Sequence, residues 1–193
     1  SCVGHNPRVG GPDETSDDRM QAPFPARERM RGVLAGRPLP PTDQAERSAA
    51  VLVCLHADEI LLVRRRTDPR DKWSGHIGLP GGRYESDDGT LLETALRETH
   101  EELGFRATDK GRLLGPLGTY LARHKRPDDL AIAVFVAELD RRPPLELNYE
   151  IDAAHWIELD ALVTTEVEVR ERPDLVPAYT PMSGEGRLVV WGI

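Results

Sequence analysis

The chain has little cysteine and no long hydrophobic run. Its 193 residues include two cysteines, Cys2 in a polar stretch and Cys54 in an apolar one, which is not the pattern of a disulfide framework. The longest apolar runs, 49–55 and 130–137, are far too short to span a bilayer and are typical of buried strands. No basic segment followed by an apolar one opens the chain. We therefore expect no secretory leader, no membrane partner and a cytoplasmic location.

Positive charge is also in deficit. The 25 Lys and Arg residues against 33 Asp and Glu residues give a formal net charge of −8. A general nucleic-acid-binding protein needs a basic face to displace counterions, so we expect no nucleic-acid partner. Carboxylates that hold a divalent cation would contribute to such a negative balance. Internal repeats, zinc-ligand spacings and Ser/His/Asp constellations do not stand out either.

The remaining composition is that of a globular protein, with 39% hydrophobic and 30% charged residues. Residues 1–22 are rich in Gly, Pro, Asp and Ser, which predicts a flexible N-terminal tail and leaves 23–193 as a single domain. An amphipathic helix is predicted at 26–36 and ends at Gly36. Hydrophobic patterning predicts strands at 48–55, 59–65, 112–121, 129–139, 151–158 and 186–192, an exposed strand at 167–171 and a helical turn at 159–163. Strands around a central helix indicate a mixed α/β domain.

That central helix is predicted at about 90–103. Thr90 or Asp88 is suited to cap its start, and Gly104 is suited to end it in a left-handed conformation. Helical periodicity places one apolar stripe, by which the helix should pack, at Leu92, Leu96, Thr99 and Leu103. The same periodicity places three carboxylates together on another flank, at Glu98, Glu101 and Glu102.

Like charges at helical spacing repel, so this flank costs stability unless a positive group lies against it. Hard divalent cations bind carboxylate oxygens and keep waters for substrate phosphates. Arg97 is placed to restrain a neighbouring acid by a fork-like contact. The turn at Gly81 and Gly82 lets the backbone come close to a ligand, and one of its carbonyls is a candidate metal ligand. Taken alone, a charged helix flank is more often solvated surface. The glycine turn before it and Gly104 after it favour a metal site.

The stretch "RETHEELGF" resembles the second half of the Nudix box, with Arg-Glu, two further glutamates and a glycine at that motif's spacing. The first half departs from the motif. Gly82 lies one residue too far from Arg97, and Gly89 stands where the first glutamate is required. Asp88, six residues after Gly82, is the replacement. This one-residue expansion resembles the coenzyme A diphosphatase branch of the family, as do the segments "AAVLVCL", "EILLVRRR", "TALRE" and "LVVWGI".

The resemblance implies the Nudix α/β/α sandwich, an α/β fold with a mixed central sheet. It implies metal-dependent hydrolysis of a nucleoside diphosphate linked to another moiety, with Mg²⁺ or Mn²⁺ as the cofactor. Coenzyme A or a derivative is the substrate that the branch implies. ADP-ribose, a dinucleotide or an oxidised nucleoside triphosphate stays open, because "WSGHIGLPGG" departs from that branch's His-x-Gly-Gln stretch. The second hypothesis is a non-catalytic module that senses a nucleotide, although such modules tend to lose the box carboxylates that this chain keeps.

The resemblance and the residues together give a set of candidates. They are Glu98, Glu101, Glu102 and Gly82 for the metal, Glu101, Glu102, Arg97 and Glu150 for catalysis, and Arg65, Trp73 and His76 for substrate binding. The sequence does not choose the general base among Glu101, Glu102 and Glu150. A loop histidine such as His76 is more often structural, and Trp73 is equally suited to anchoring its loop.

A sheet in this fold needs cover on both faces, and only one helix is strongly indicated. We expect the second face to be covered by the 26–36 helix, by a helix beyond Ile193, or by a partner chain in a homodimer.

Overall fold

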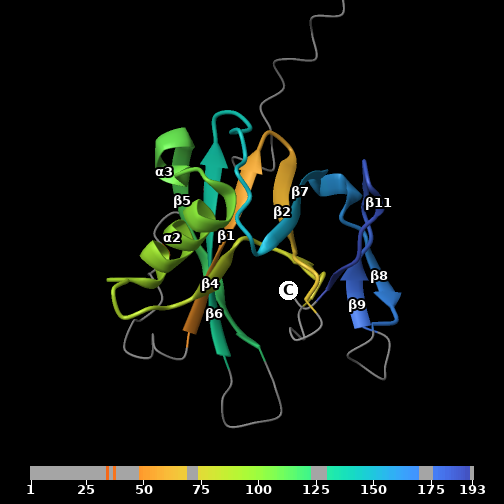
Figure 1. The fold of residues 1–193 in the computed structure, drawn as a ribbon, viewed down its shortest axis with the longest axis horizontal. Coiled ribbons are helices and arrows are strands. Elements are labelled where there is room, and N and C mark those ends of the chain that lie inside the picture. The colour runs from red at the N-terminus through yellow and green to blue at the C-terminus, as the bar shows by residue number, and fades with distance from the viewer. Residues whose placement is uncertain are drawn as a thin grey trace, which may run out of the picture.

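The computed structural model describes residues 34, 37, 48–68, 74–122, 130–169 and 176–191 (Figure 1). The predicted tail at 1–22, most of the predicted 26–36 helix and Trp73 lie outside these residues. None of the described helices is long and apolar enough to cross a membrane.

The predicted mixed α/β architecture is confirmed. The main sheet contains β1 (Ser48–His56), β2 (Glu59–Arg65), β3 (Ile77–Gly78), β4 (Gly81–Arg83), β5 (Gly111–Ala122), β6 (Leu130–Leu139), β7 (Ile151–Glu158), β8 (Thr164–Val167), β9 (Val176–Tyr179) and β12 (Val190–Trp191). A separate hairpin contains β10 (Met182–Ser183) and β11 (Gly186–Arg187), and the helices are α2 (Leu91–Leu103), α3 (Ala107–Lys110) and the 3₁₀ turn η2 (Leu159–Ala161). In Figure 1, α2 and α3 lie beside β1, β5 and β6, whereas β8, β9 and β11 lie at the opposite end of the molecule.

Strand β1 lies at the centre of the sheet and pairs with three other strands. It pairs in parallel with β6, from Ser48 opposite Ala131 to Leu55 opposite Glu138. Its first half also pairs antiparallel with β4, and its last residues form the predicted hairpin with β2. Strand β2 in turn pairs antiparallel with β7 along its whole length, with a bulge between Arg64 and Arg65. The glycine turn is thereby attached to the centre of the fold.

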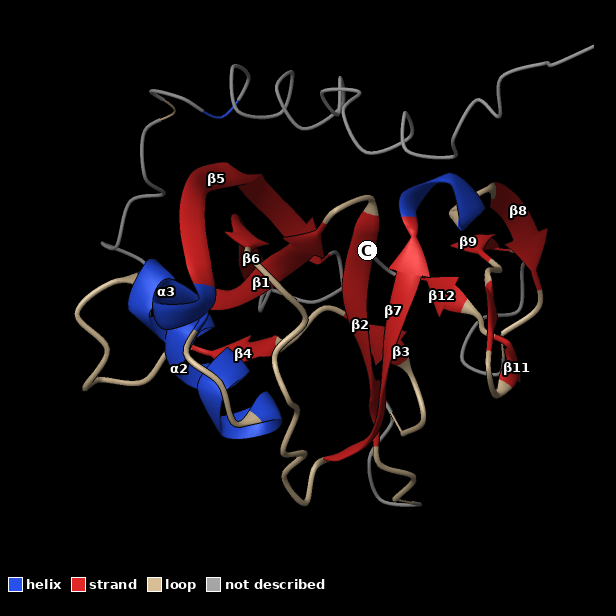
Figure 2. Ribbon diagram, turned by 90° about the horizontal axis from the view of Figure 1, so that it is seen from above, coloured by secondary structure: helices blue, strands red, loops and turns tan. Residues whose placement is uncertain are grey.

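Both faces of β1 are buried, as is usual for a strand in a parallel pair. Ala50, Leu52 and Cys54 belong to a core cluster with buried residues of α2 and α3, which lie on that side of the sheet (Figure 2). Burial raises the pKa of the Cys54 thiol to about 12, which suits a residue that fills core space and not a nucleophile.

The other face of β1 and β6 is covered by Leu34, which comes from the segment predicted as the 26–36 helix. Leu34 is 1% exposed and belongs to a cluster with Val53, Leu55, Val134 and Val136. Leu34 is the only residue of the predicted 26–36 helix that the structure describes, and it lies on this face of the sheet.

Replacing Leu34 with alanine is expected to lower the free energy of unfolding by about 2–4 kcal/mol, because a buried leucine loses its transfer energy and leaves a cavity. Urea unfolding followed by circular dichroism measures this. The matched control is Val163→Ala, since Val163 is 67% exposed and its truncation should change stability by less than about 0.5 kcal/mol. Equal stability of the Leu34 variant and the control would mean that Leu34 does not cover the sheet in solution.

Helix α2 begins and ends as predicted. The Thr90 side chain accepts a hydrogen bond from the Glu93 N–H, and Gly104, with φ of 75°, donates from its N–H to His100 O. The predicted apolar stripe packs on the core, with Thr99 and Leu103 buried and with Leu92 and Leu96 partly buried against the core cluster. The residues that the helix buries are Leu91, Thr94, Ala95, Thr99, Glu102 and Leu103. Small side chains in the middle of this face let the helix approach the sheet closely.

The C-terminal strands differ from the prediction. The strand expected at 186–192 is broken into β11 and β12, with Leu188 buried between them. The strand expected at 167–171 lies earlier, in β8, and residues 170–171 are outside the described part of the chain. Strand β12 pairs in parallel with β3, so the C-terminal strands are joined to the segment that leads into the glycine turn.

Candidate active site

The glycine turn brings backbone against α2, and each of its glycines is needed for a different reason. Gly81 has φ of 147°, and a Cβ there would overlap the backbone of Ala50 and Val51. Gly82 lies under the helix, where a Cβ would overlap the carboxyl group of Glu98. The Gly81 N–H donates a 3.0 Å hydrogen bond to Glu102 Oε2.

Arg97 and Asp88 form a fork-like ion pair. Arg97 Nε donates to Asp88 Oδ1 at 2.8 Å, and Nη2 donates to Oδ2 at 2.9 Å. Asp88 is buried and also accepts from Thr94 Oγ1 at 2.9 Å and from the Glu85 N–H at 3.0 Å. The Arg97 hydrogen bonds are the main cause that lowers the pKa of Asp88 to about 2. Asp88 therefore occupies the position beside the box arginine that the spacing assigned to it.

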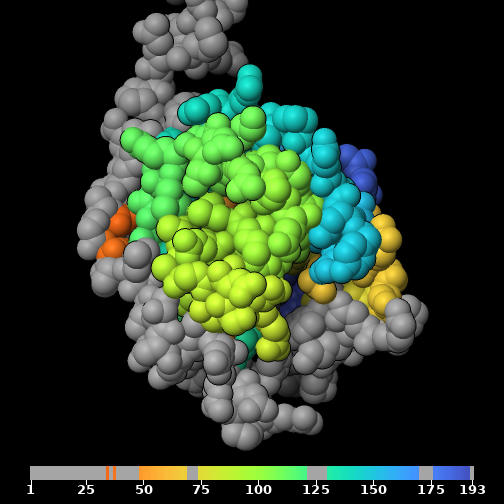
Figure 3. All heavy atoms as spheres, turned by 60° about the vertical axis from the view of Figure 1, so that its left-hand side comes forward, coloured from red at the N-terminus to blue at the C-terminus, as the bar shows by residue number. Residues whose placement is uncertain are grey.

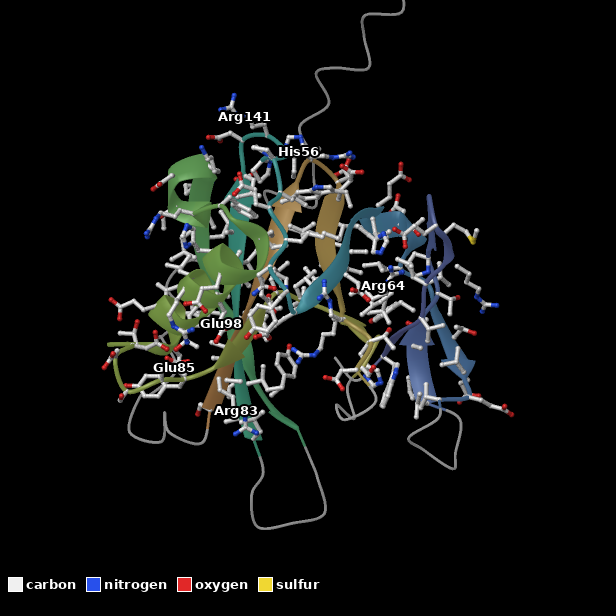
Figure 4. The ribbon with its side chains drawn as sticks, viewed as in Figure 1. His56, Arg64, Arg83, Glu85, Glu98 and Arg141 are labelled. Atoms are coloured by element: carbon white, nitrogen blue, oxygen red, sulfur yellow. The ribbon has the colours of Figure 1, made fainter. Side chains whose placement is uncertain are left out.

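The third guanidinium nitrogen of Arg97 restrains the box carboxylates. Nη1 donates to Glu98 Oε1 at 3.0 Å and to Glu101 Oε2 at 3.2 Å. Nη2 also donates to the carbonyl of Arg83 at 3.1 Å, which ties the helix to the end of β4. Figure 4 shows Glu98 between α2 and β4. The predicted restraint by Arg97 is confirmed, and it extends to three acids.

The three predicted metal ligands have unequal surroundings, which periodicity did not indicate. Glu102 is buried, the Glu98 side chain is 18% exposed, and that of Glu101 is 52% exposed. Burial raises the pKa of Glu102 to about 8 and also raises that of Glu98. The cause of the difference is the turn at Gly81 and the segment before β7, which close over one side of the helix end.

Glu150 reaches this cluster from a distant part of the chain. The Asn148 N–H donates to Glu102 O at 3.1 Å, and the Arg66 N–H donates to Glu150 O at 2.7 Å. The segment before β7 thus spans from the end of α2 to the end of β2, and Figure 3 shows it (cyan) beside α2 (green) on one face. The charge of Glu150 raises the pKa of both Glu98 and Glu102. The structure therefore brings Glu150 together with the box carboxylates.

The predicted substrate-binding residues do not all lie at the carboxylate cluster. Arg65 lies close enough to Glu102 for its charge to lower the pKa of that carboxyl group. Its neighbour Arg64 is directed toward the C-terminal strands and pairs with Glu185 at 2.7 Å (Figure 4). The His76 ring lies 5.0 Å from that of Trp191, so it packs against β12. A role for His76 or Trp73 in substrate binding stays a prediction.

The donor chemistry fits a hard divalent cation. The charge of Glu150 raises the pKa of Glu98 and of Glu102, and the charge of Glu98 also raises the pKa of Glu102. Carboxylate oxygen is the ligand that Mg²⁺ and Mn²⁺ prefer. Within the described ranges, no three His, Cys, Asp or Glu side chains are already gathered in the geometry of a metal site. Arg97 explains why these carboxylates are not gathered around a common point, because it holds Glu98 and Glu101 in ion pairs.

Two neighbours of this cluster were not predicted. The Gly81 N–H orients Glu102, and Tyr149 stands beside Glu150 with most of its surface exposed. An aromatic residue directly before the candidate Glu150, in an otherwise polar stretch, is the signal that would have identified Tyr149.

Replacing Gly81 or Gly82 with alanine is expected to have different effects, on stability in the first case and on turnover in the second. Gly82→Ala displaces only the flexible end of Glu98, so turnover should fall about 10–100-fold, as for loss of a metal's supporting contacts, with little change in unfolding temperature. Gly81→Ala puts a Cβ at positive φ against backbone and should destabilise the protein by more than about 1 kcal/mol. Thermal unfolding and steady-state kinetics check both. A destabilised Gly82→Ala protein, or a stable Gly81→Ala protein, would contradict this account.

Comparison with known proteins places this arrangement in a family. A model described as NUDIX domain matches residues 46–179. The protein named peroxisomal coenzyme A diphosphatase ndx-8, from Caenorhabditis elegans, is 34% identical over 128 residues, which cover 63% of this chain and 53% of that protein. An uncharacterized Nudix hydrolase NudL from Yersinia pestis is 38% identical over 85 residues, covering 42% of this chain and 43% of that protein.

Among solved structures, a MutT NUDIX hydrolase from Burkholderia pseudomallei is 22% identical, with a TM-score of 0.48, and covers 58% of this chain and 83% of that one. The chain spans about half, or less, of the length of these curated relatives. Because the family model covers most of the described sheet together with the box helix, the chain belongs to the Nudix family.

Proposed function

We propose that this chain is a metal-dependent diphosphatase that hydrolyses a nucleoside diphosphate linked to another moiety. The observation that carries the proposal is the Arg97 network. One guanidinium group pairs with Asp88, Glu98 and Glu101 and also bonds the carbonyl of Arg83, and the charge of Glu150 raises the pKa of Glu98 and Glu102. A solvated helix flank would need neither the buried ion pair nor the convergence of acids from two distant segments.

The proposed ligands are Glu98, Glu101, Glu102 and the carbonyl of Gly82. A bound Mg²⁺ or Mn²⁺ would neutralise the diphosphate and lower the pKa of water. The chain's own residues do the positioning. Arg97 orients Glu98, the Gly81 N–H orients Glu102, and Arg65 is placed to contact the diphosphate.

One of the carboxylates takes the proton from the attacking water. Glu101, Glu102 and Glu150 are the candidates, and a positioned general base contributes about 10²–10⁴-fold to the rate. The variants Glu101→Gln, Glu102→Gln and Glu150→Gln distinguish them when kcat is compared at Mg²⁺ concentrations that saturate each variant, as determined by calorimetry, because the base is then the residue whose loss lowers kcat most.

Coenzyme A or an acyl derivative is the first candidate substrate. The spacing of Asp88 in the box and the relative named coenzyme A diphosphatase both support this choice. A diphosphate flanked by two organic groups has no free terminal phosphate, so the site must accept bulk on both sides of the phosphorus.

The test is a substrate panel with Mg²⁺ and with Mn²⁺, with products identified by chromatography. It contains coenzyme A, acetyl-coenzyme A, ADP-ribose, a dinucleoside polyphosphate and an oxidised nucleoside triphosphate. Cleavage of coenzyme A to 3′,5′-ADP and a phosphopantetheine is the expected result. Release of pyrophosphate from nucleoside triphosphates with coenzyme A untouched would overturn the substrate choice. No turnover of any compound would favour a nucleotide-sensing module.

A further inference from the structure

Tyr149 is an exposed aromatic residue at the edge of the carboxylate cluster. It is 74% exposed, more than any other large hydrophobic residue that the structure describes. A single exposed aromatic residue is ordinary on a protein surface. What distinguishes Tyr149 is its position, directly before Glu150 and between two anchored residues.

The backbone on both sides of Tyr149 is fixed by hydrogen bonds. The Asn148 N–H donates to Glu102 O at 3.1 Å, and the Glu150 N–H donates to Asn148 Oδ1 at 2.8 Å. The Glu150 carbonyl accepts from the Arg66 N–H at 2.7 Å. Tyr149 is therefore held between the end of α2 and the end of β2, at the same place as the candidate ligands.

Tyr149 also lies beside the candidate acids. Glu150 directly follows it, and the Glu150 carboxylate raises the pKa of the Tyr149 hydroxyl group, with the charge of Glu101 acting in the same direction. Because Glu150 also raises the pKa of Glu98 and Glu102, the ring lies beside the group of acids that would face the diphosphate. Most of the ring surface stays open to solvent.

We propose that Tyr149 is a substrate-binding residue on whose ring the aromatic base of the nucleotide stacks. This inference rests on the proposed function and names the part of the substrate that the site recognises beyond the diphosphate. Every nucleobase offers a flat π-face, so stacking tolerates different bases. A tyrosine whose backbone is held by hydrogen bonds on both sides, and whose side chain has only two rotatable bonds, loses little conformational entropy when a base binds.

The first experiment compares Tyr149→Ala, Tyr149→Phe and Tyr149→Trp on the best substrate of the panel. Alanine should raise KM about 5–100-fold, the cost of losing one stacked base, while kcat stays unchanged. Phenylalanine and tryptophan keep an aromatic face and should keep KM close to that of the unmodified protein. The matched control is Tyr120→Ala, because Tyr120 is 55% exposed on β5. A phenylalanine variant as impaired as the alanine variant would overturn the stacking role, since only the hydroxyl group would then matter.

The second experiment needs no turnover. Binding of 5′-AMP and of ribose 5-phosphate, which lacks the base, is measured by NMR titration in the presence of Mg²⁺. The unmodified protein should bind 5′-AMP more tightly, and Tyr149→Ala should lose that preference while keeping its affinity for ribose 5-phosphate. An unchanged preference would overturn the role of Tyr149 and leave the diphosphatase proposal standing. Failure of the unmodified protein to bind 5′-AMP, together with no turnover on the panel, would overturn both.

Discussion

Replacing Glu98 or Glu102 with glutamine is expected to lower Mg²⁺-dependent turnover by more than about 100-fold. Loss of a residue that only supports a ligand costs about 10–100-fold, and loss of a ligand should cost more. The fold should survive, because glutamine matches the shape of glutamate. Without metal, Glu102→Gln should be slightly more stable than the unmodified protein, since burial raises the pKa of Glu102 to about 8 and its ionised form is unfavourable at neutral pH.

Steady-state kinetics and thermal unfolding, each with Mg²⁺ and with EDTA, measure both effects. The control is Glu93→Gln, a glutamate-to-glutamine change in the exposed first turn of the same helix. We expect the control to keep its turnover and its stabilisation by Mg²⁺. Full Mg²⁺-dependent activity in Glu98→Gln or Glu102→Gln would refute the assignment of these residues as ligands.

Removing the guanidinium group of Arg97 is expected to lower both stability and turnover. Arg97→Met keeps the apolar stem but leaves Asp88 buried and charged without its fork, which should cost about 3 kcal/mol. Turnover should fall as well, because Glu98 loses its restraint. The pKa of Asp88 is about 2 in the folded protein against 3.8 ordinarily, so its stabilisation is fully present above about pH 4. That stabilisation is lost as the pH falls toward 2, and the gap between the two proteins should narrow there.

The double variant Asp88→Asn/Arg97→Met separates the two effects. It has no uncompensated buried charge, so its free energy of unfolding should lie closer to that of the unmodified protein than that of Arg97→Met does. Its turnover should stay low, because Glu98 is still unrestrained. The single variant Asp88→Asn completes the comparison. If the double variant loses as much stability as Asp88→Asn and Arg97→Met lose together, Asp88 and Arg97 do not act as a pair.

Local patterns predicted the long elements well. Strands β1, β2, β6 and β7 and the limits of α2 follow from apolar runs, periodicity and the caps Thr90 and Gly104. The short strands β3 and β4 were missed because they consist of Ile77–Gly78 and Gly81–Arg83, which have weak strand propensity. Strand β4 exists because Ala49, Ala50 and Val51 of β1 provide a partner. Such pairing comes from the tertiary structure and leaves no local pattern.

The site shows the same division. Helical spacing identified Arg97 and the three glutamates, and the resemblance to the Nudix box added Asp88, because box residues lie within one helix and the turn before it. Periodicity did not reveal that Glu102 is buried, because its cover comes from Gly81 and Asn148, which lie outside the helix. Position in the helix gave the direction of each carboxylate, and distant segments set its burial and pKa.

The parallel pairing of β1 with β6 also determines when the site is assembled. A parallel pair between strands that enclose a helix in sequence closes a long loop, and such pairing forms slowly. Glu150 and Tyr149 follow β6 in the sequence, so during synthesis they become available to α2 only after β6 has been made. A nascent chain synthesised as far as β5 already contains Arg97 and all three box glutamates. It still lacks Glu150 and the segment before β7. Catalytic activity should therefore appear late in folding, when β7 pairs with β2.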